Sequence, residues 1–233
     1  MTQYEKANPL SIRALFNSIA PRYDFGNAVL SGNLHRLWNS RLVALVAKDA
    51  PTAAVDLCCG TGEIARRMMH KLPDSHYTLV DFSEEMLNLA KQRLAGSNTT
   101  FCQADAECLP LPDASFDAAT CAYGIRNIQN RANSFTEVYR VLKPGSKFGI
   151  VELTRPTGRL MRALHSMYLH TMVPLVGRAI TSNEAAYKYL CKSIEAFVPS
   201  EQIVRELQAA GFCDIEVVPQ TFGIATLFFA KKI

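Results

Sequence analysis

The sequence predicts an open α/β fold, Rossmann-like, with a mostly parallel seven-stranded sheet and helices on both faces. The strongest indication is residues 53–63, where a short apolar run ends in the turn Gly60-Thr61-Gly62 and a helical pattern follows directly. Apolar runs then alternate with helical patterns to about residue 153, which is typical of parallel strands with right-handed crossovers. Glycines at the carboxyl end of a first strand let the backbone approach a nucleotide, so the fold predicts a nucleotide pocket there.

The central part of the chain, residues 52–153, is expected to form the core of this sheet. Apolar runs begin at residues 53, 77, 100, 116 and 148, and each predicts a strand. A helix is expected over 84–94, where Ser83 can cap the first turn. Another is expected over about 131–142, where Lys143-Pro144-Gly145 ends it.

Residues 1–51 precede the sheet and are expected to form a helical lid. Apolar side chains at helical spacing predict one helix that Pro21 ends and a second that ends near Pro51. Between them, residues 20–27 hold Tyr23 and Asp24 in a stretch with poor helix chemistry. This stretch is either a lid segment that supplies substrate contacts or a plain connector, and its local pattern leaves both interpretations open.

Residues 154–198 are expected to form a helical insert after the fifth strand. The stretch 154–183 contains no Asp or Glu, and its charges are basic, Arg178 among them. One interpretation is a cover that receives an apolar substrate and touches an anionic membrane surface. The other is a lid helix buried on the sheet or in a dimer contact.

The last part of the chain, residues 199–233, is expected to close the sheet. A helix begins at Pro199-Ser200-Glu201 and ends at Gly211. Apolar runs at 215–218 and 225–229 predict two strands, and residues 219–223 can join them as an antiparallel pair.

Composition argues against several classes of protein. The 233 residues carry a formal net charge of +4 without a dense stripe of Lys and Arg, so no nucleic-acid interface is expected. Seven cysteines without regular spacing or a C-x-x-C pair argue against a disulfide scaffold and a zinc site. The sequence shows no signal peptide and no apolar run of about 18 residues, so a cytoplasmic location is expected. No metal is expected either, because the spacing of metal ligands is missing.

Carboxylates at the ends of three successive strands point to the cofactor. Residues 60–65 match the dinucleotide fingerprint G-x-G-x-x-A, which alone is a weak indication. Asp56 would repel a pyrophosphate but can hold the ammonium of S-adenosylmethionine, whereas Asp81 can accept ribose hydroxyls from either cofactor. Asp105, with Ala106, stands where an adenine amine can be recognised. Acid after each of the first three strands is typical of a class I methyltransferase; the alternative is that all three are ordinary helix caps.

Several stretches resemble the C-methyltransferases of menaquinone and ubiquinone biosynthesis, and the similarity covers nearly the whole chain. The stretches 56–62 and 81–87 are shared by many methyltransferases, whereas 20–24, 124–127 and 187–190 are more specific. The Cys-Cys-Gly-Thr loop and Asp-Phe-Ser are more similar to the menaquinone branch. The chain departs from the common pattern at Cys58, where glycine is frequent, and at Asp105, where many members have Asn.

The resemblance implies S-adenosylmethionine-dependent C-methylation of a prenylated quinol ring, with demethylmenaquinol converted to menaquinol. It implies cofactor contacts at Thr61, Asp81, Asp105 and Ala106, beside Asp56, Gly60 and Gly62 from the loop. A homodimer and a loose contact with the inner face of the membrane are further expectations. The alternatives are a ubiquinone-pathway benzoquinol, another small acceptor such as a sterol, a polyketide phenol or an arsenical, and a non-catalytic binding module, against which the intact loop argues.

Five side chains are hypothesised to act on the quinol. Arg126 and Asn127 follow the fourth strand at the cofactor's edge of the sheet, so Arg126 is expected to stabilise the phenolate and Asn127 to bind substrate. Asp24 or Tyr23 is expected to act as the base or to orient one, and His165 is a further substrate contact. The alternative for Arg126 is a structural ion pair.

Overall fold

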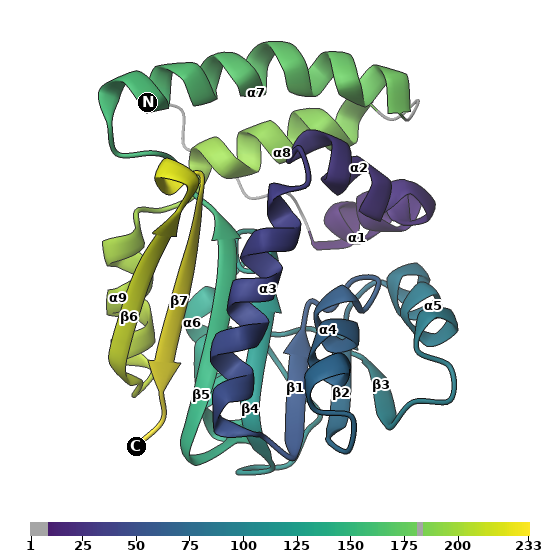
Figure 1. The fold of residues 1–233 in the computed structure, drawn as a ribbon, viewed down its shortest axis with the longest axis vertical. Helices are drawn as coiled ribbons and strands as arrows, with labels where there is room; N and C mark the ends of the chain where they lie inside the picture. The colour runs from purple at the N-terminus through teal and green to yellow at the C-terminus, as the bar shows by residue number, and fades with distance from the viewer. Residues whose placement is uncertain (1–8, 181–183) are drawn as a thin grey trace.

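The computed structural model describes residues 9–180 and 184–233. A seven-stranded sheet with strand order β3-β2-β1-β4-β5-β7-β6 runs through the molecule (Figure 1). The strands are β1 (Ala53–Leu57), β2 (His76–Asp81), β3 (Thr99–Gln103), β4 (Phe116–Ala122), β5 (Leu142–Leu153), β6 (Cys213–Gln220) and β7 (Ala225–Lys231).

The register of the strands confirms the predicted parallel core. β1 pairs in parallel with β2 and β4, and Val55 lies opposite Thr78 on one side and Ala119 on the other. β7 is antiparallel to both β5 and β6, so the C-terminal pair closes the sheet as the sequence predicted. The carboxyl ends of β1, β2 and β4 therefore meet at one edge, where the glycine turn lies.

Helices cover both faces of the sheet. On one face lie α3 (Leu34–Val46), α4 (Glu63–Lys71) and α5 (Glu84–Arg93), and on the other α6 (Arg131–Val141) and α9 (Ser200–Ala209). Short 3₁₀ turns are η1 (Ala20–Arg22), η2 (Ala47–Asp49) and η3 (Thr221–Gly223). The buried apolar residues divide accordingly into one cluster that holds Trp38 and Leu79 and a second that holds Phe135 and Phe148.

A separate layer of helices lies over the carboxyl ends of the parallel strands (Figure 1). It consists of α1 (Pro9–Ile19), α2 (Tyr23–Leu30), α7 (Arg159–Ile180) and α8 (Glu184–Ala196). A small apolar cluster that includes Leu169 and Ile194 holds α7 on α8. The predicted lid and insert thus come together above the predicted nucleotide pocket, although they are more than a hundred residues apart in the chain.

The structure corrects two boundaries. Residues 20–27, predicted to be poor helix formers, are helical: Pro21 lies in the first turn of η1, where its preset φ suits a helix, and the chain continues into α2. Gly26 is buried there, and a β-carbon on it would lie 3.5 Å from the Tyr187 hydroxyl, so packing against α8 overrides its low propensity. β5 begins at Leu142 rather than at residue 148, because Leu142 pairs with Phe116 ahead of a register shift.

Candidate active site

The glycine turn after β1 requires backbone conformations that few residues adopt. Gly60 and Gly62 have φ of +53° and +77°, and Cys58 has φ of +51°. A β-carbon on Gly62 would meet Leu79 and Leu94 at 3.3 and 3.1 Å, so this glycine lets α4 pack on the core. Glycine is the residue best suited to positive φ, which gives a physical reason for the glycine expected in place of Cys58.

Three adjoining cavities lie beneath the lid helices. The loop crevice is bounded by the glycine turn, the ends of β2 and β4, and α1. The polar chamber, ≈ 400 Å³, lies beside the same turn, and the apolar cavity, ≈ 470 Å³, lies between α2, α3 and α7. Tyr23 and Tyr123 line all three, so they stand where the cavities meet.

Each cavity has its own chemistry. The loop crevice is lined by residues that include Phe16, Gly60, Asp81, Phe82, Met86, Asp105, Ala106 and Asn127. The polar chamber is lined by charged and polar residues that include Asp24, His35, Asn39, Asp56, Thr61, Glu63, Arg66, Arg67 and Arg93. The apolar cavity is lined by residues that include Leu30, Trp38, Arg126, Leu153, Met161, Leu164, His165, Tyr168, Leu169 and Ile194.

Asp56 lines the polar chamber and has one carboxylate oxygen without a hydrogen-bond partner among the described residues. It is buried at the end of β1, and its Oδ1 accepts a hydrogen bond from the Thr120 hydroxyl at 2.7 Å. Its Oδ2 is buried without a hydrogen-bond partner among the described residues. Burial raises the pKa of Asp56 to about 7, and the nearby Asp81 adds to the rise. A cationic ligand beside Oδ2 would offset both the burial of the carboxylate and its repulsion by Asp81.

Asp81 fixes the glycine turn as it ends β2. Its Oδ2 accepts from the Gly60 N–H at 2.8 Å and its Oδ1 from the Ser83 N–H at 2.9 Å. Burial raises the pKa of Asp81 to about 6, and these backbone donors partly offset the rise. Because a carboxylate can accept about four hydrogen bonds, Asp81 keeps capacity for two ligand hydroxyls.

Asp105 and Ala106 form the far end of the loop crevice. Asp105 is exposed and its Oδ1 accepts from the Glu107 N–H at 3.0 Å, so one carboxylate oxygen remains available. Ala106 is buried against the crevice. The structure therefore brings Asp81, Asp105 and Ala106 to one crevice and Asp56 to the adjoining chamber.

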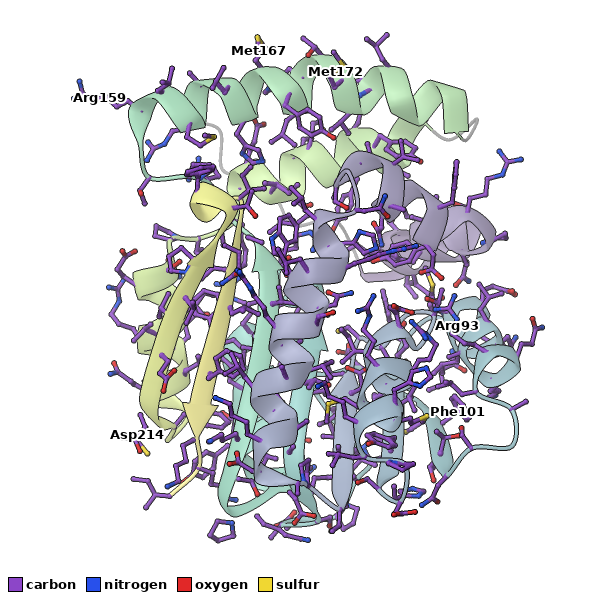
Figure 2. All side chains as sticks on the ribbon, in the orientation of Figure 1. Arg93, Phe101, Arg159, Met167, Met172 and Asp214 are labelled. Atoms are coloured by element: carbon purple, nitrogen blue, oxygen red, sulfur yellow. The ribbon has the colours of Figure 1, made fainter. Side chains whose placement is uncertain are left out.

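Thr61 and Asp24 join the lid to the glycine turn. The Thr61 hydroxyl donates to Asp24 Oδ1 at 2.8 Å and accepts from Arg93 Nη1 at 3.0 Å. Arg93, on α5, also forms an ion pair with Asp24. Figure 2 shows Arg93 beside the lid helices. A second contact lies nearby, where the Ser83 hydroxyl donates to Asn17 Oδ1 of α1 at 2.6 Å.

Arg126 is held in a buried ion pair with Glu152 of β5. Its Nη1 lies 2.5 Å from Glu152 Oε1, and the two side chains are 5% and 0% exposed. The Nε of Arg126 is buried without a hydrogen-bond partner among the described residues, and the side chain lines the apolar cavity. Asn127 lines the loop crevice instead, where Tyr189 donates to its Oδ1 at 3.0 Å.

Tyr23 and His165 both reach the apolar cavity. Burial raises the pKa of the Tyr23 hydroxyl, and the charge of Arg126 partly offsets the rise. Burial lowers the pKa of His165, which lies on α7. At neutral pH Tyr23 is therefore a hydrogen-bond donor and His165 a neutral imidazole.

Sequence reasoning missed Tyr123, which lines all three cavities. It has φ of +57°, and its hydroxyl donates to Oδ1 of the buried Asn39 at 2.8 Å. Its carbonyl accepts from Arg126 Nη1 and Asn127 Nδ2. The available signal in the sequence was that Tyr123 directly precedes Gly124. The structure shows why glycine is needed there: a β-carbon on Gly124 would lie 2.5 Å from the β-carbon of Cys58.

The whole chain matches a known family. The model of the ubiE/COQ5 methyltransferase family matches residues 1–232. The chain belongs to this family. A demethylmenaquinone methyltransferase from Protochlamydia amoebophila is 43% identical over 100% of this chain and 99% of its own length. One from Chlamydia caviae is 37% identical over 97% of this chain and 98% of its own length. The family predicted from the sequence is confirmed.

Solved methyltransferase structures share the fold of this ubiE/COQ5 family member. A S-adenosylmethionine-dependent methyltransferase from Thermotoga maritima has a TM-score of 0.63 at 17% identity, over 94% of this chain and 99% of that chain. One from Aquifex aeolicus has a TM-score of 0.57 at 17% identity, over 78% and 82%. The predicted class I methyltransferase fold is confirmed.

The family identifies the enzyme as a S-adenosylmethionine-dependent methyltransferase, and its site fits that cofactor. Asp56 Oδ2 is an unpaired acceptor suited to the ammonium group, and Asp81 has room for the ribose hydroxyls. Asp105 and Ala106 border the remaining crevice, where the adenine would lie. The dinucleotide alternative would place a pyrophosphate beside two buried carboxylates, which is unfavourable.

Proposed function

We propose that this methyltransferase methylates a ring carbon of a reduced, prenylated naphthoquinone, as the name of its relatives indicates. The observation that carries the proposal is the apolar cavity, ≈ 470 Å³, which adjoins the polar chamber at Tyr23 and Tyr123. A volume of this size is typical of a ligand pocket. A prenyl tail in this cavity would place its quinol ring at the junction, beside the cofactor.

The cofactor supplies the methyl group from its sulfonium. Asp56 would hold the ammonium group, Asp81 the ribose, and Asp105 with Ala106 the adenine. Thr61 would border the cofactor on the side that faces the lid. The lid helices would shield the bound cofactor from water. The chain's contribution is to fix the ring carbon in line with the methyl group, which can supply up to about 7–11 kcal/mol of the barrier.

Arg126 is proposed to stabilise the quinol oxygen as negative charge develops on it. Arg126 lines the apolar cavity, its buried Nε–H has no hydrogen-bond partner among the described residues, and its ion pair with Glu152 fixes its position. Tyr23 is proposed to orient the quinol by donating its hydroxyl hydrogen, because its raised pKa keeps it protonated. Asn127 and His165 stay proposed substrate contacts, and we place Asp24 in the contact that joins lid and turn rather than as the base.

The outer surface of α7 supports a peripheral contact with a membrane. Leu160, Leu164, Met167, Met172 and Leu175 are exposed on this helix. Met167 and Met172 lie on its outer side, and Arg159 lies at its start (Figure 2). The side chain of Arg178 lies outside the described residues. No helix in residues 9–180 or 184–233 is long and apolar enough to cross a bilayer, so the proposal is surface contact. A homodimer stays a prediction.

The tail-binding role can be tested on α7 with two matched substitutions. Leu164 lines the apolar cavity, whereas Leu160, one turn earlier, is 76% exposed and does not line it. In detergent, Leu164→Glu should raise KM for a prenylated naphthoquinol by about tenfold or more, since a charge at the wall of the cavity opposes binding of the apolar tail. Leu160→Glu should leave that KM unchanged. Equal effects of both variants, or equal use of tailed and tailless quinols by the wild type, would contradict the proposal.

A further inference from the structure

His35 lies where the polar chamber and the apolar cavity meet. Among the described residues, the titratable side chains that line both cavities are Tyr23, His35 and Tyr123. His35 is in the first turn of α3 and is half-buried. A quinol with its tail in the apolar cavity and its ring toward the cofactor would bring a ring hydroxyl to this junction.

Hydrogen bonds fix the tautomer of His35. The Ser31 hydroxyl has a single hydrogen, which it donates to the Asn27 carbonyl oxygen at 2.6 Å. Ser31 Oγ also lies 2.7 Å from His35 Nδ1. Because the hydrogen of Ser31 is already used, Nδ1 must donate to Oγ. The ring hydrogen therefore lies on Nδ1, and Nε2 carries a lone pair.

Nε2 of His35 is available to accept a proton. Within the part of the chain that the structure describes, no residue donates a hydrogen bond to it. Burial lowers the pKa of His35 below 6.5, and the charges of Arg36 and Arg67 lower it further. Glu63 and Asp24, which face it from α4 and α2, partly offset this. The imidazole is therefore neutral at pH 7.

The other titratable side chains near the junction are less suited to accept a proton from the quinol. Burial raises the pKa of both Tyr23 and Tyr123, so each keeps its hydrogen at neutral pH, and Tyr123 donates it to Asn39. Asp24 is paired with Arg93. His165 lines the apolar cavity but not the polar chamber.

We propose that His35 is the general base of the reaction and that Nε2 accepts the proton of the quinol hydroxyl; this rests on the proposed function. The O–H bond breaks as the Nε2–H bond forms, and the electron pair on oxygen activates the ring carbon. After that carbon is methylated, it releases its hydrogen to water as a proton and the aromatic ring reforms. The imidazolium returns its proton to the oxygen, so one proton leaves per methyl group transferred.

The first test reads the imidazole directly, without turnover. In protein labelled with ¹⁵N-histidine, nitrogen shifts should show His35 with hydrogen on Nδ1 and a pKa below 6.5. Addition of a reduced prenylated naphthoquinol should shift the Nε2 resonance. Hydrogen on Nε2 in the free protein, or no response to the quinol, would overturn the proposal.

The second test separates the base from the structural hydrogen bond. In His35→Asn the amide can still donate to Ser31 but Nε2 is gone, so kcat should fall by about 10²–10⁴-fold with cofactor affinity unchanged. The acid limb of the pH profile should also disappear. The charged groups that act on the imidazole are Arg36, Arg67, Glu63 and Asp24, and Arg126 and His165 line the same apolar cavity. His70→Asn, an exposed control on α4, should keep full activity.

The outcomes distinguish the role of His35 from the proposed function on which it rests. A wild type that binds S-adenosylmethionine but methylates no quinol would overturn both. An active wild type with an equally active His35→Asn variant would overturn the role of His35 alone. Partial recovery of His35→Ala by added imidazole would support it.

Discussion

The Thr120 hydroxyl donates to one oxygen of Asp56 at 2.7 Å, and the other oxygen is buried with no hydrogen-bond partner in residues 9–180 and 184–233. In the unfolded chain this carboxyl ionises near 3.8, whereas in the fold it keeps its proton to about 7. The folded state therefore binds more protons between these values, and the free energy of unfolding falls as pH rises through this window. The full shift corresponds to roughly 4 kcal/mol.

We therefore predict that Asp56→Asn stabilises the free protein at pH 8 while it weakens S-adenosylmethionine binding. Urea unfolding at pH 5 and pH 8, without cofactor, should show a smaller loss of stability with rising pH than in the wild type. Asp81, whose pKa burial raises to about 6, would account for the remainder. An unchanged pH dependence in Asp56→Asn would contradict this account of the buried carboxylate.

Asp81 accepts from the Gly60 N–H of the glycine turn and is the proposed partner of the cofactor ribose. Asp81→Asn should raise the dissociation constant of S-adenosylmethionine about tenfold or more, a loss of at least about 1.4 kcal/mol. The amide keeps one acceptor for the Gly60 N–H, so the turn should persist. Asp74→Asn, at an exposed turn, is the matched control, and calorimetric titration is the measurement. Equal affinities in the two variants would remove Asp81 from the cofactor site.

The buried Arg126–Glu152 ion pair is a structural contact to which we also assign the proposed role of Arg126 in turnover. Arg126→Ala leaves Glu152 buried and unpaired, so the free energy of unfolding should fall by about 3–5 kcal/mol. In Arg126→Met combined with Glu152→Gln, stability should largely return but turnover should not. Cofactor affinity in this double variant should stay near the wild-type value. Recovery of turnover together with stability would show that the ion pair alone matters.

Gly124 and Cys58 constrain each other across the glycine turn. In Gly124→Ala the new β-carbon would lie 2.5 Å from the β-carbon of Cys58, so the variant should be destabilised and bind the cofactor weakly. Cys58→Gly, which also removes the positive-φ strain, should rescue it in part, because the Cys121 sulfur would still lie 2.9 Å from the new β-carbon. Cys58→Ala, which removes only the sulfur, should rescue it less, and thermal unfolding would rank the three. Equal rescue by both would contradict the geometry.

The contact of Asp24 with Arg93 and Thr61 holds the lid over the crevice. The Asp24 and Arg93 side chains are 43% and 29% exposed, so the ion pair contributes at most about 1 kcal/mol to stability. The loop crevice lies beneath the lid helices, so we expect the lid to move when the cofactor exchanges. Asp24→Asn should therefore speed cofactor dissociation in stopped-flow measurements with little change in thermal stability. Slower turnover with unchanged dissociation would instead favour a chemical role for Asp24.

The sequence was sufficient for the order of strands along the chain, because continuous apolar runs and a glycine turn are local signals. It predicted the parallel core, the antiparallel closure and the Ser83 cap, which accepts from the Met86 N–H at 3.2 Å. It failed at residues 20–27, because the helix there depends on the packing of Gly26 against Tyr187, a contact between distant segments.

The carboxylates proposed to hold the cofactor were predictable as neighbours, because each lies at or just after the end of a strand and parallel strands end on the same side of the sheet. The partners of the catalytic candidates were not. Glu152 meets Arg126 only through the pairing of β4 with β5, and Asn39 meets Tyr123 through the packing of α3. The tautomer of His35 depends on the hydroxyl direction of Ser31, which no sequence pattern records.

The most direct test of the account is methyl transfer from labelled S-adenosylmethionine to a reduced prenylated naphthoquinone, with a prenylated benzoquinol as the competing acceptor. The account predicts label on the ring carbon of the naphthoquinol, with little on the benzoquinol. Label in neither acceptor, from protein that binds the cofactor, would contradict the proposed substrate while it leaves the methyltransferase fold and cofactor site in place.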